Sequence, residues 1–386
     1  FTLSSRQRII VRREIARLKS TGSDERLLKE LERDYRYAGE ETCAGDGLCS
    51  MSCPVGINTG DLTHRLRGEH MCPGTLGYAV GDFAANHFSG VKSMLRPVLT
   101  MANGVHSMVG TGMMNGVART AHGLGLPLWT AAMPKAYKPQ TKDYCGIDGT
   151  VKMKAVYFPS CINQTMGASK GALSEVPLVK KTVSLLAKAG IETVFPADMD
   201  KLCCGTIWES KGMEDIADRK TAELEAALWE ASEHGRWPVL CDQSPCLHRM
   251  RHKIKRMKLY EPVEFIWTFV RPRLAFTPKD ATVAVHITCS TRKMGLGDML
   301  VRLAEMCASK VIVPEGVGCC GFAGDKGFTH PEVNAYALRK LRPAIEAAGV
   351  TAGYSNSRTC EIGLTTHSGV PYESIVYLVD ECTEPI

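Results

Sequence analysis

Apolar and polar positions follow helical spacing over the first part of the chain. In residues 4–38 apolar positions alternate with charged ones, and Ile10, Ile15 and Leu18 fall roughly on one side. Residues 21–24 interrupt this pattern with a sequence typical of a helix start. The pattern therefore predicts two helices, and a solvated face is the default interpretation of their charges.

Residues 76–140 are rich in Gly, Met and Ala and poor in charge. They predict amphipathic helices with loops, ending in a proline-punctuated linker. The methionines of this stretch admit two interpretations, a surface for a quinone or a partner, and an adaptable packing layer. They are Met94, Met101, Met108, Met113, Met114 and Met133.

From residue 151 short apolar runs alternate with helical stretches, and the same order occurs twice. Alternating strands and helices indicate an α/β unit with a largely parallel sheet. The internal repeat supports this assignment because two separate stretches predict the same structure. We expect four segments: a helical domain at 1–75, a helical connecting segment at 76–150, and two pseudo-symmetric α/β repeats at 151–275 and 276–386.

The tripeptide Cys-Cys-Gly occurs once in each repeat, between two single cysteines. Each of these cysteines comes just after a predicted strand, on the side of a parallel sheet where ligands bind. Four thiolates from three loops suit a soft metal or an iron–sulfur cluster. The first candidate site is Cys161, Cys203, Cys204 and Cys246, and the second is Cys289, Cys319, Cys320 and Cys360.

A separate cysteine run lies upstream, in ETCAGDGLCSMSCPVGI. It matches the bacterial ferredoxin run C-x2-C-x2-C-x3-C-P at Cys43, Cys49, Cys53 and Pro54, with Asp46 in place of the second cysteine. We expect Cys43 and Cys49 to bind a ferredoxin-type cluster. Asp46 is either a third, oxygen ligand or a loop carboxylate, and a zinc site is the alternative for the whole run.

The fourth cysteine of such a run serves a second cluster in two-cluster ferredoxins. Cys53 then needs a partner motif, which we expect upstream of Phe1, where the chain opens without a methionine. Cys72 is an alternative ligand that completes a lone cluster, although Cys-Pro pairs are also common in turns.

Composition narrows the protein class. The chain has 386 residues, 44% hydrophobic and 23% charged, and 16 cysteines, which excludes a small secreted disulfide scaffold and favours a reducing compartment. A net charge of +6 fits an acidic partner or an anionic substrate and does not indicate nucleic acid. The longest stretch without charge, residues 97–118, is too polar to span a bilayer, and no secretory signal is visible.

The Cys…CCG…Cys repeat resembles the cysteine-rich CCG domain family, which includes heterodisulfide reductase and the iron–sulfur component of glycolate oxidase. Those proteins similarly join ferredoxin-type motifs to two CCG repeats. FTLSSRQRIIVRREI and CAGDGLC look most like the C-terminal half of bacterial fused FAD and iron–sulfur D-2-hydroxyacid dehydrogenases, of the D-2-hydroxyglutarate or D-lactate type. The resemblance covers nearly the whole chain and is only suggestive for substrate.

The chain departs from the family at one point. The family's repeat usually ends in C-x2-C, and Gln243 and Ser357 stand where the first of those cysteines would lie. This puts in doubt a five-thiolate noncubane cluster, whereas four thiols per repeat suffice for a [4Fe–4S] cluster. Whether both repeats are filled, or one is empty or holds zinc, stays open.

The resemblance implies an electron-transfer role. A flavin removes hydride from a 2-hydroxy acid, and one or more [4Fe–4S] clusters pass electrons singly to a quinone or other acceptor. The chain carries no P-loop signature, and its G-x-G-x-x-G spacing at 316–321 belongs to the second Cys-Cys-Gly, so we expect FAD in an upstream or partner domain. We expect a cytoplasmic oxidoreductase component, peripheral at the inner membrane face if its acceptor is a membrane quinone.

Two other functions fit the cysteines. One is a thiol–disulfide reductase like heterodisulfide reductase, and the other is a zinc-stabilised assembly module with no redox role.

We interpret the remaining cysteines, Cys145, Cys241, Cys307 and Cys382, as structural. His248 and His286 are expected to be packing residues, with hydrogen bonding to substrate or sulfur as the alternative. The basic run at 249–258 is a solvated helix face or a docking site for an acidic partner or the flavin domain.

Overall fold

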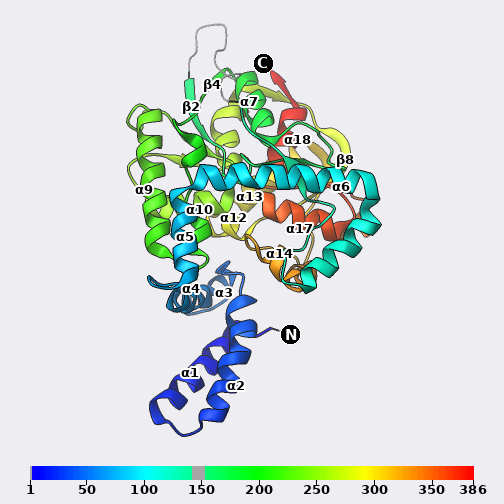
Figure 1. Ribbon diagram of the computed structural model, residues 1–386. Helices are drawn as coiled ribbons and strands as arrows, with labels where there is room; N and C mark the ends of the chain where they lie inside the picture. Colours follow the sequence, from blue (N-terminus) through cyan, green and yellow to red (C-terminus); the bar gives the residue numbers. More distant parts are fainter. Residues whose placement is uncertain (1, 141–152) are drawn as a thin grey trace.

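The computed structural model describes residues 2–140 and 153–386. A helical N-terminal region lies beside two parallel α/β sheets that follow each other along the chain (Figure 1). This confirms the predicted fold class. The segment boundaries expected from the sequence stay predictions.

The N-terminal region begins with the two predicted helices. Ser4 and Gln7 form a reciprocal capping box at the start of α1 (Ser5–Thr21), and Gly22, with φ 62°, ends it. The Asp24 side chain accepts from the Leu27 N–H at 2.9 Å and caps α2 (Glu25–Tyr35). Ile10 is 52% exposed and does not share the buried side of this helix pair. The π-helix η1 (Arg36–Glu41), α3 (Leu48–Met51) and α4 (Thr59–His70) follow.

The first sheet has four parallel strands in the order β4-β2-β5-β6. Its strands are β2 (Met153–Phe158), β4 (Ile191–Val194), β5 (Val239–Cys241) and β6 (Leu259–Tyr260). The connecting helices include α7 (Leu178–Lys188), η3 (Met199–Lys201), α8 (Thr206–Glu209), α9 (Glu214–Ala231), α10 (Ser244–Lys253) and α11 (Pro262–Phe265). The sequence pattern predicted the first three strands and missed β6, which is too short to show a period.

The second sheet repeats this topology in the order β9-β8-β10-β11. Its strands are β8 (Lys279–Val285), β9 (Ala308–Ile312), β10 (Ala352–Ser355) and β11 (Tyr372–Ser374). Its helices are α12 (Cys289–Lys293), α13 (Gly297–Glu305), α14 (Lys326–Thr329), α15 (Pro331–Ala337), α16 (Leu341–Ala348), α17 (Arg358–Ser368) and α18 (Ile375–Glu381). Since the strand order of the first sheet recurs, the pseudo-symmetric repeat is a property of the fold.

Smaller elements complete the two repeats. The π-helix η4 (Ile266–Val270) and the 3-10 helix η5 (Arg271–Arg273) follow α11, and two short antiparallel pairs flank the sheets. These pairs are β1 (Pro134–Ala136) with β3 (Met166–Ser169), and β7 (Leu274–Phe276) with β12 (Thr383–Pro385).

The two repeats share their largest hydrophobic core. This cluster joins Leu185 and Phe265 of the first repeat to Leu300 and Tyr377 of the second. Asp380 of α18 is also ion-paired with Lys181 of α7 at 3.0 Å. Because the core is continuous, neither repeat buries its apolar face alone.

Helices α5 (Leu76–Asn86) and α6 (Phe88–Gly123) lie between the N-terminal region and the first sheet in sequence. The long cyan helix α6 crosses the molecule in Figure 1 and changes direction near its end. The change of direction has a local cause, since Gly110 leaves helical geometry with φ 75° and ψ 168°. None of the described helices is long and apolar enough to cross a bilayer.

Candidate metal centres

The thiols of each repeat follow three neighbouring parallel strands. In the first repeat Cys161 comes after β2, the Cys203–Cys204 pair after β4, and Cys246 stands in the first turn of α10, after β5. The second repeat uses β8, β9 and β10 in the same way, with Cys289 and Cys360 in the first turns of α12 and α17. The carboxyl ends of parallel strands meet at one sheet edge, so the fold places each set of thiols together.

The four thiols of the first repeat form a chain of neighbours, from Cys161 through Cys203 and Cys204 to Cys246. Hydrogen-bonding contacts with Cys161 and Cys204, together with burial, raise the pKa of Cys203. The pKa of Cys204 is held well below its ordinary value by hydrogen bonds from Cys203 and Cys246. The Thr206 hydroxyl also lies 3.2 Å from the Cys204 sulfur. One thiol of the four is thus stabilised as a thiolate by its neighbours.

The second repeat has a similar chain. Contact with Cys319, followed by burial, raises the pKa of Cys289. The sulfurs of Cys320 and Cys360 lie 3.0 Å apart. Backbone N–H groups of Gly321 and Phe322 donate to the sulfurs of Cys319 and Cys320 at 3.3 and 3.5 Å. Such N–H donors are typical of loops that hold iron–sulfur thiolates.

The glycine of each Cys-Cys-Gly is required by the backbone. Gly205 has φ +88° and a Cβ there would lie 2.3 Å from the carbonyl oxygen of Ala217. Gly321 has φ +71° and its Cβ would lie 2.8 Å from the carbonyl oxygen of Val333. Both glycines therefore let the cysteine loop turn tightly against the following helix, α9 or α15.

Helices α9, α10 and α15 hold the cysteine loops by hydrogen bonds. The carbonyl oxygen of Cys204 accepts from Thr221 Oγ1 at 2.8 Å and from Arg249 Nε at 3.0 Å. The carbonyl oxygen of Cys320 accepts from Asn334 Nδ2 at 2.6 Å. These contacts fix both loops before any metal binds.

Gln243 and Ser357 face each other across the junction of the two repeats. The Gln243 amide donates to Ser357 Oγ at 2.9 Å, and the Arg358 N–H donates to Gln243 Oε1 at 3.0 Å. The two positions where the family carries a further cysteine are therefore occupied here by a buried, hydrogen-bonded pair. They provide no thiol for a fifth ligand.

The upstream cysteine run lies between the helices of the N-terminal region. Cys43 is buried, and Arg67 donates to its carbonyl oxygen at 2.9 Å. The Cys49 sulfur lies 3.4 Å from Thr59 Oγ1. Burial raises the pKa of Cys49, and the hydrogen bonds from Thr59 and Gly60 outweigh it and lower that pKa overall.

The end of the run is more open. Cys53 is partly exposed, and its carbonyl oxygen accepts from the Gly56 N–H at 3.0 Å. Cys72 is exposed in a turn, where its thiol meets the carbonyl oxygen of Glu69 at 3.7 Å. The assignment of Cys43, Cys49 and Cys53 as ligands, and the alternative that Cys72 completes a lone cluster, stay predictions.

Asp46 points to the second repeat as well as to its own loop. Its carboxylate accepts from the Leu48 N–H at 3.1 Å. The Asp46 carboxylate also lies close to Cys289 and Cys319. Its negative charge raises the pKa of both thiols, in addition to the effects of the neighbouring thiols and of burial. The loop touches α12 at Gly47, where a Cβ would lie 2.4 Å from Lys293 Nζ. The upstream run thus lies against the second thiol site.

Arg67 joins the upstream run to the first repeat. One guanidinium nitrogen donates to the carbonyl oxygen of Ser210 at 2.7 Å, and the other donates to Glu40 and Cys43. Gly68 and Gly212 meet so closely that a Cβ at Gly212 would lie 2.2 Å from the Gly68 nitrogen. The N-terminal region is therefore fastened to both repeats at their cysteine-bearing edges.

The remaining cysteines that the structure describes are buried, as is His286, whereas His248 is partly exposed. Cys241 is buried in β5, and Cys307 and Cys382 contact each other, with the Cys382 thiol 3.2 Å from the Cys307 carbonyl oxygen. Burial lowers the pKa of His286 to about 4, and that of His248 to about 4. Neutral rings agree with packing roles. Cys145 lies outside the described residues.

Two lysines lie near the cysteine loops, and the sequence pattern did not indicate either of them. Lys92 of α6 is buried, donates to Gln164 Oε1 at 2.7 Å, and interacts electrostatically with Cys161 and Cys203. Burial lowers the pKa of Lys92 to about 8. Lys293 lies by the upstream run. No motif marks either residue, because their positions depend on helices packing from elsewhere in the chain.

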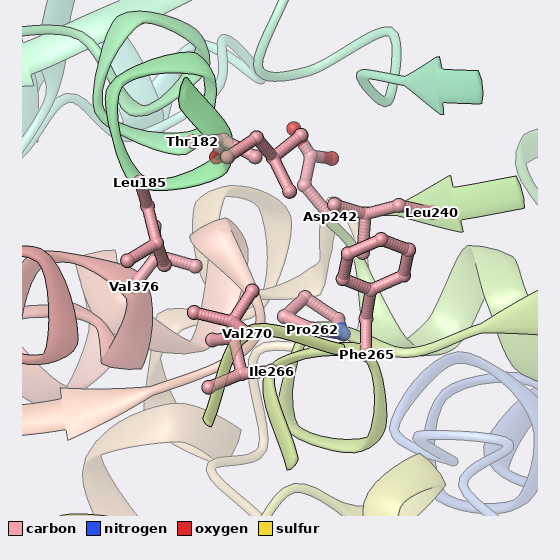
Figure 2. A pocket seen from close by; sticks show the side chains of 10 residues that line it. Thr182, Leu185, Leu240, Asp242, Pro262, Phe265, Ile266, Val270 and Val376 are labelled. Carbon is pink, nitrogen blue, oxygen red and sulfur yellow. The ribbon is translucent and has the colours of Figure 1, made fainter. Parts of the chain in front are cut away.

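The described residues contain no group of three His, Cys, Asp or Glu side chains arranged around one point for a single metal ion. The sulfurs instead lie as neighbours along each chain of contacts. A small cavity between α7, α11 and α18 (Figure 2) is also separate from the thiols. Its lining is apolar apart from Thr182 and Asp242, and Asp242 already accepts from Tyr157 OH at 2.7 Å.

A comparison with protein families matches this geometry. The cysteine-rich domain family called CCG matches residues 155–251 and again residues 283–365. The C-terminal part of the chain therefore contains two cysteine-rich CCG domains. Each match spans all four thiols of one repeat, and CCG domains are typical of iron–sulfur redox proteins.

Two other comparisons add little to the CCG assignment. No curated protein matches the chain. Among solved structures, an aspartate racemase homologue from Pyrococcus horikoshii OT3 is similar over 60% of this chain and 96% of its own, at 9% identity. Its TM-score of 0.25 is too low to support any conclusion.

Proposed function

We propose that this chain is the iron–sulfur electron-transfer part of a flavin-linked D-2-hydroxyacid dehydrogenase, of the D-2-hydroxyglutarate, D-lactate or glycolate class. It passes electrons from FAD, held in an upstream or partner domain, to a quinone or another acceptor. The observation that carries the proposal is the pair of matched four-thiol sets, each following three parallel strands of a CCG domain.

The donor set fits a [4Fe–4S] cluster in each repeat. Four neighbouring thiols that are buried or partly buried cannot all ionise without a cationic group between them, because their charges repel. A cluster takes four thiolates and supplies one-electron transfer when bound. The residues that would hold it are Cys161, Cys203, Cys204 and Cys246, and in the second repeat Cys289, Cys319, Cys320 and Cys360.

The surrounding groups suit electron transfer. The N–H groups of Gly321 and Phe322 and the hydroxyl of Thr206 donate to cysteine sulfurs. Hydrogen bonds to sulfur and burial are the means by which a protein sets the potential of such a cluster. Cys43 and Cys49, with Asp46 as a further candidate, would hold a third cluster beside the second repeat, and Cys53 would serve another cluster of the ferredoxin type.

The hydroxyacid class depends on the resemblance of residues 1–15 and of the CAGDGLC run to fused flavin enzymes. Gln243 and Ser357 pair with each other and offer no thiol. This pairing disfavours the heterodisulfide-reductase alternative. The zinc alternative uses the same thiols as tetrahedral ligands, so metal analysis has to separate it from a cluster.

Metal analysis with two matched variants tests the proposal. The full chain, purified without oxygen, should contain iron and acid-labile sulfide in multiples of four. Cys204→Ser should lose the iron of one repeat, because Cys204 accepts hydrogen bonds from two other thiols of its set. Cys241→Ser, an equally buried cysteine outside the set, should keep all of it.

Zinc without iron would contradict the electron-transfer role. Equal iron content in the two variants would show that the ligand set is wrong. Electron paramagnetic resonance of the reduced protein separates a cubane from a noncubane cluster. The hydroxyacid class is tested with the flavin domain present. D-2-hydroxyglutarate, D-lactate or glycolate should reduce the flavin, and no reduction by any of the three contradicts the assignment.

A further inference from the structure

Helices α5 and α6 turn an apolar face away from the protein. On α5 the exposed residues Leu76, Val80 and Phe83 are spaced four and three residues apart. On α6 the same spacing of four and three gives one stripe, which consists of Met94, Val98, Met101, Val105 and Met108, exposed by 42% to 86%. After the kink at Gly110 the exposed apolar residues continue with Met113, Val117, Leu124 and Leu126.

The opposite side of α6 is the polar one, and it contacts the protein. Lys92 donates to Gln164 Oε1 at 2.7 Å, and Arg96 Nε donates to the Tyr137 carbonyl oxygen at 3.1 Å. Ser89 donates to Asp200 at 2.6 Å. A helix that only covers the protein core has the reverse arrangement, with its apolar side inward. Four of the six methionines of this stretch are therefore not a packing layer within the described residues.

The charged residues of this stretch indicate which kind of partner can cover the apolar face. No Asp or Glu occurs between Asp82 and Asp143, although Lys92, Arg96, Arg119, Lys135, Lys138 and Lys142 do. Arg119 and Lys138 are exposed. Asp82, at the edge of the stretch, is ion-paired with Arg219 at 2.5 Å. The face combines apolar side chains with exposed positive charge and lacks carboxylates of its own.

We propose that the α5–α6 face binds the surface of a bilayer containing anionic phospholipids. The methionine, valine and leucine side chains enter the boundary of the acyl chains, and Arg119 and Lys138 contact the phosphate headgroups. A protein partner or a second copy of this chain would tolerate carboxylates at the rim of such a face, whereas an anionic bilayer repels them. The absence of acid over the whole stretch is what favours the bilayer. This inference does not depend on bound clusters or on the substrate.

Vesicle co-sedimentation tests the inference with the full chain. Vesicles of phosphatidylcholine mixed with phosphatidylglycerol should pull down the protein, more weakly at high salt, and pure phosphatidylcholine should bind it less. The triple variant Met94→Gln, Met101→Gln, Met108→Gln should bind the mixed vesicles at least tenfold more weakly. Arg119→Gln with Lys138→Gln should reduce binding to the mixed vesicles and leave binding to phosphatidylcholine unchanged.

A control variant removes apolar side chains elsewhere. Leu173→Gln with Ile386→Gln, both exposed residues outside α5 and α6, should bind like the unchanged chain. Failure of the unchanged chain to bind either kind of vesicle overturns the inference. So does a dimer, or a complex with the flavin domain, that the triple variant dissociates while vesicle binding stays the same, since the face would then be a protein interface.

Discussion

At the scale of single residues, the Cys-Cys-Gly glycines have the clearest structural explanation. Gly205 and Gly321 occupy corresponding places and share a left-handed φ and a close approach to a carbonyl oxygen. Each thus allows the second cysteine of its pair to face the remaining thiols. The sequence marks these glycines by repetition, and the packing of the following helix explains them.

Gly321→Ala should therefore destabilise the protein and its second site. The positive φ alone costs an alanine about 1–2 kcal/mol, and the Cβ contact with Val333 adds to it. Gly349→Ala is the matched control, because Gly349 has φ +64° but nothing within 4 Å of its Cβ. Denaturant unfolding and iron content measure both effects. Equal losses for the two variants would mean that the helix approach plays no part.

At the scale of elements, a buried carboxylate caps the start of a helix at the junction between the repeats. Glu261 caps α11, where its side chain accepts from the Val263 N–H at 2.7 Å, and Asn356 of the second repeat also donates to it. Burial raises the pKa of Glu261 to about 7. This carboxylate joins a helix cap to the junction between the repeats.

The sign of the resulting pH dependence is fixed. Between an unfolded pKa of 4.5 and a folded pKa of about 7, the folded protein binds an extra proton at Glu261. The contribution of Glu261 to stability therefore falls as the pH rises through that window, by roughly 2–3 kcal/mol. Glu261→Gln should flatten this slope in unfolding measured from pH 5 to pH 8. Glu346→Gln, an exposed carboxylate on α16, should keep it; a slope unchanged by Glu261→Gln contradicts the assignment.

At the scale of the whole molecule, the two thiol sites differ in the charges beside them. Lys92 of α6 lies near the first set, and Asp46 of the upstream run lies near the second. A nearby cation favours an added electron and a nearby anion opposes it. The first site should consequently have the higher reduction potential, so that electrons pass from the second repeat to the first and toward α6.

Potentials measured by redox titration should respond to these charges in opposite directions. Lys92→Met should lower the potential of the first site, and Asp46→Asn should raise that of the second. A charge several ångströms away at an effective dielectric of about 20 contributes roughly 2 kcal/mol, or on the order of 50–100 mV. Arg119→Gln, exposed on α6, should change neither. Shifts of the same sign for both variants would contradict this order.

The local and repeated features of this protein follow from its sequence alone. Strand and helix periods, the helix start at Asp24 and the duplicated cysteine pattern predicted two α/β repeats with thiols beyond their strands. These signals lie within short stretches, so they can be recognised without knowing what packs against them. The two-residue β6 was missed because two residues show no period, and β11 was missed as well.

Which distant groups meet is a property of the tertiary structure. Gln243 faces Ser357, Asp46 faces the second thiol set, and Lys92 lies by the first, although no spacing relates these residues. The fold also turned the apolar side of α6 outward, where the sequence pattern indicated an amphipathic helix but not which side faces the protein. The physical reason is that such pairings depend on how whole elements pack, and packing joins residues far apart in the chain.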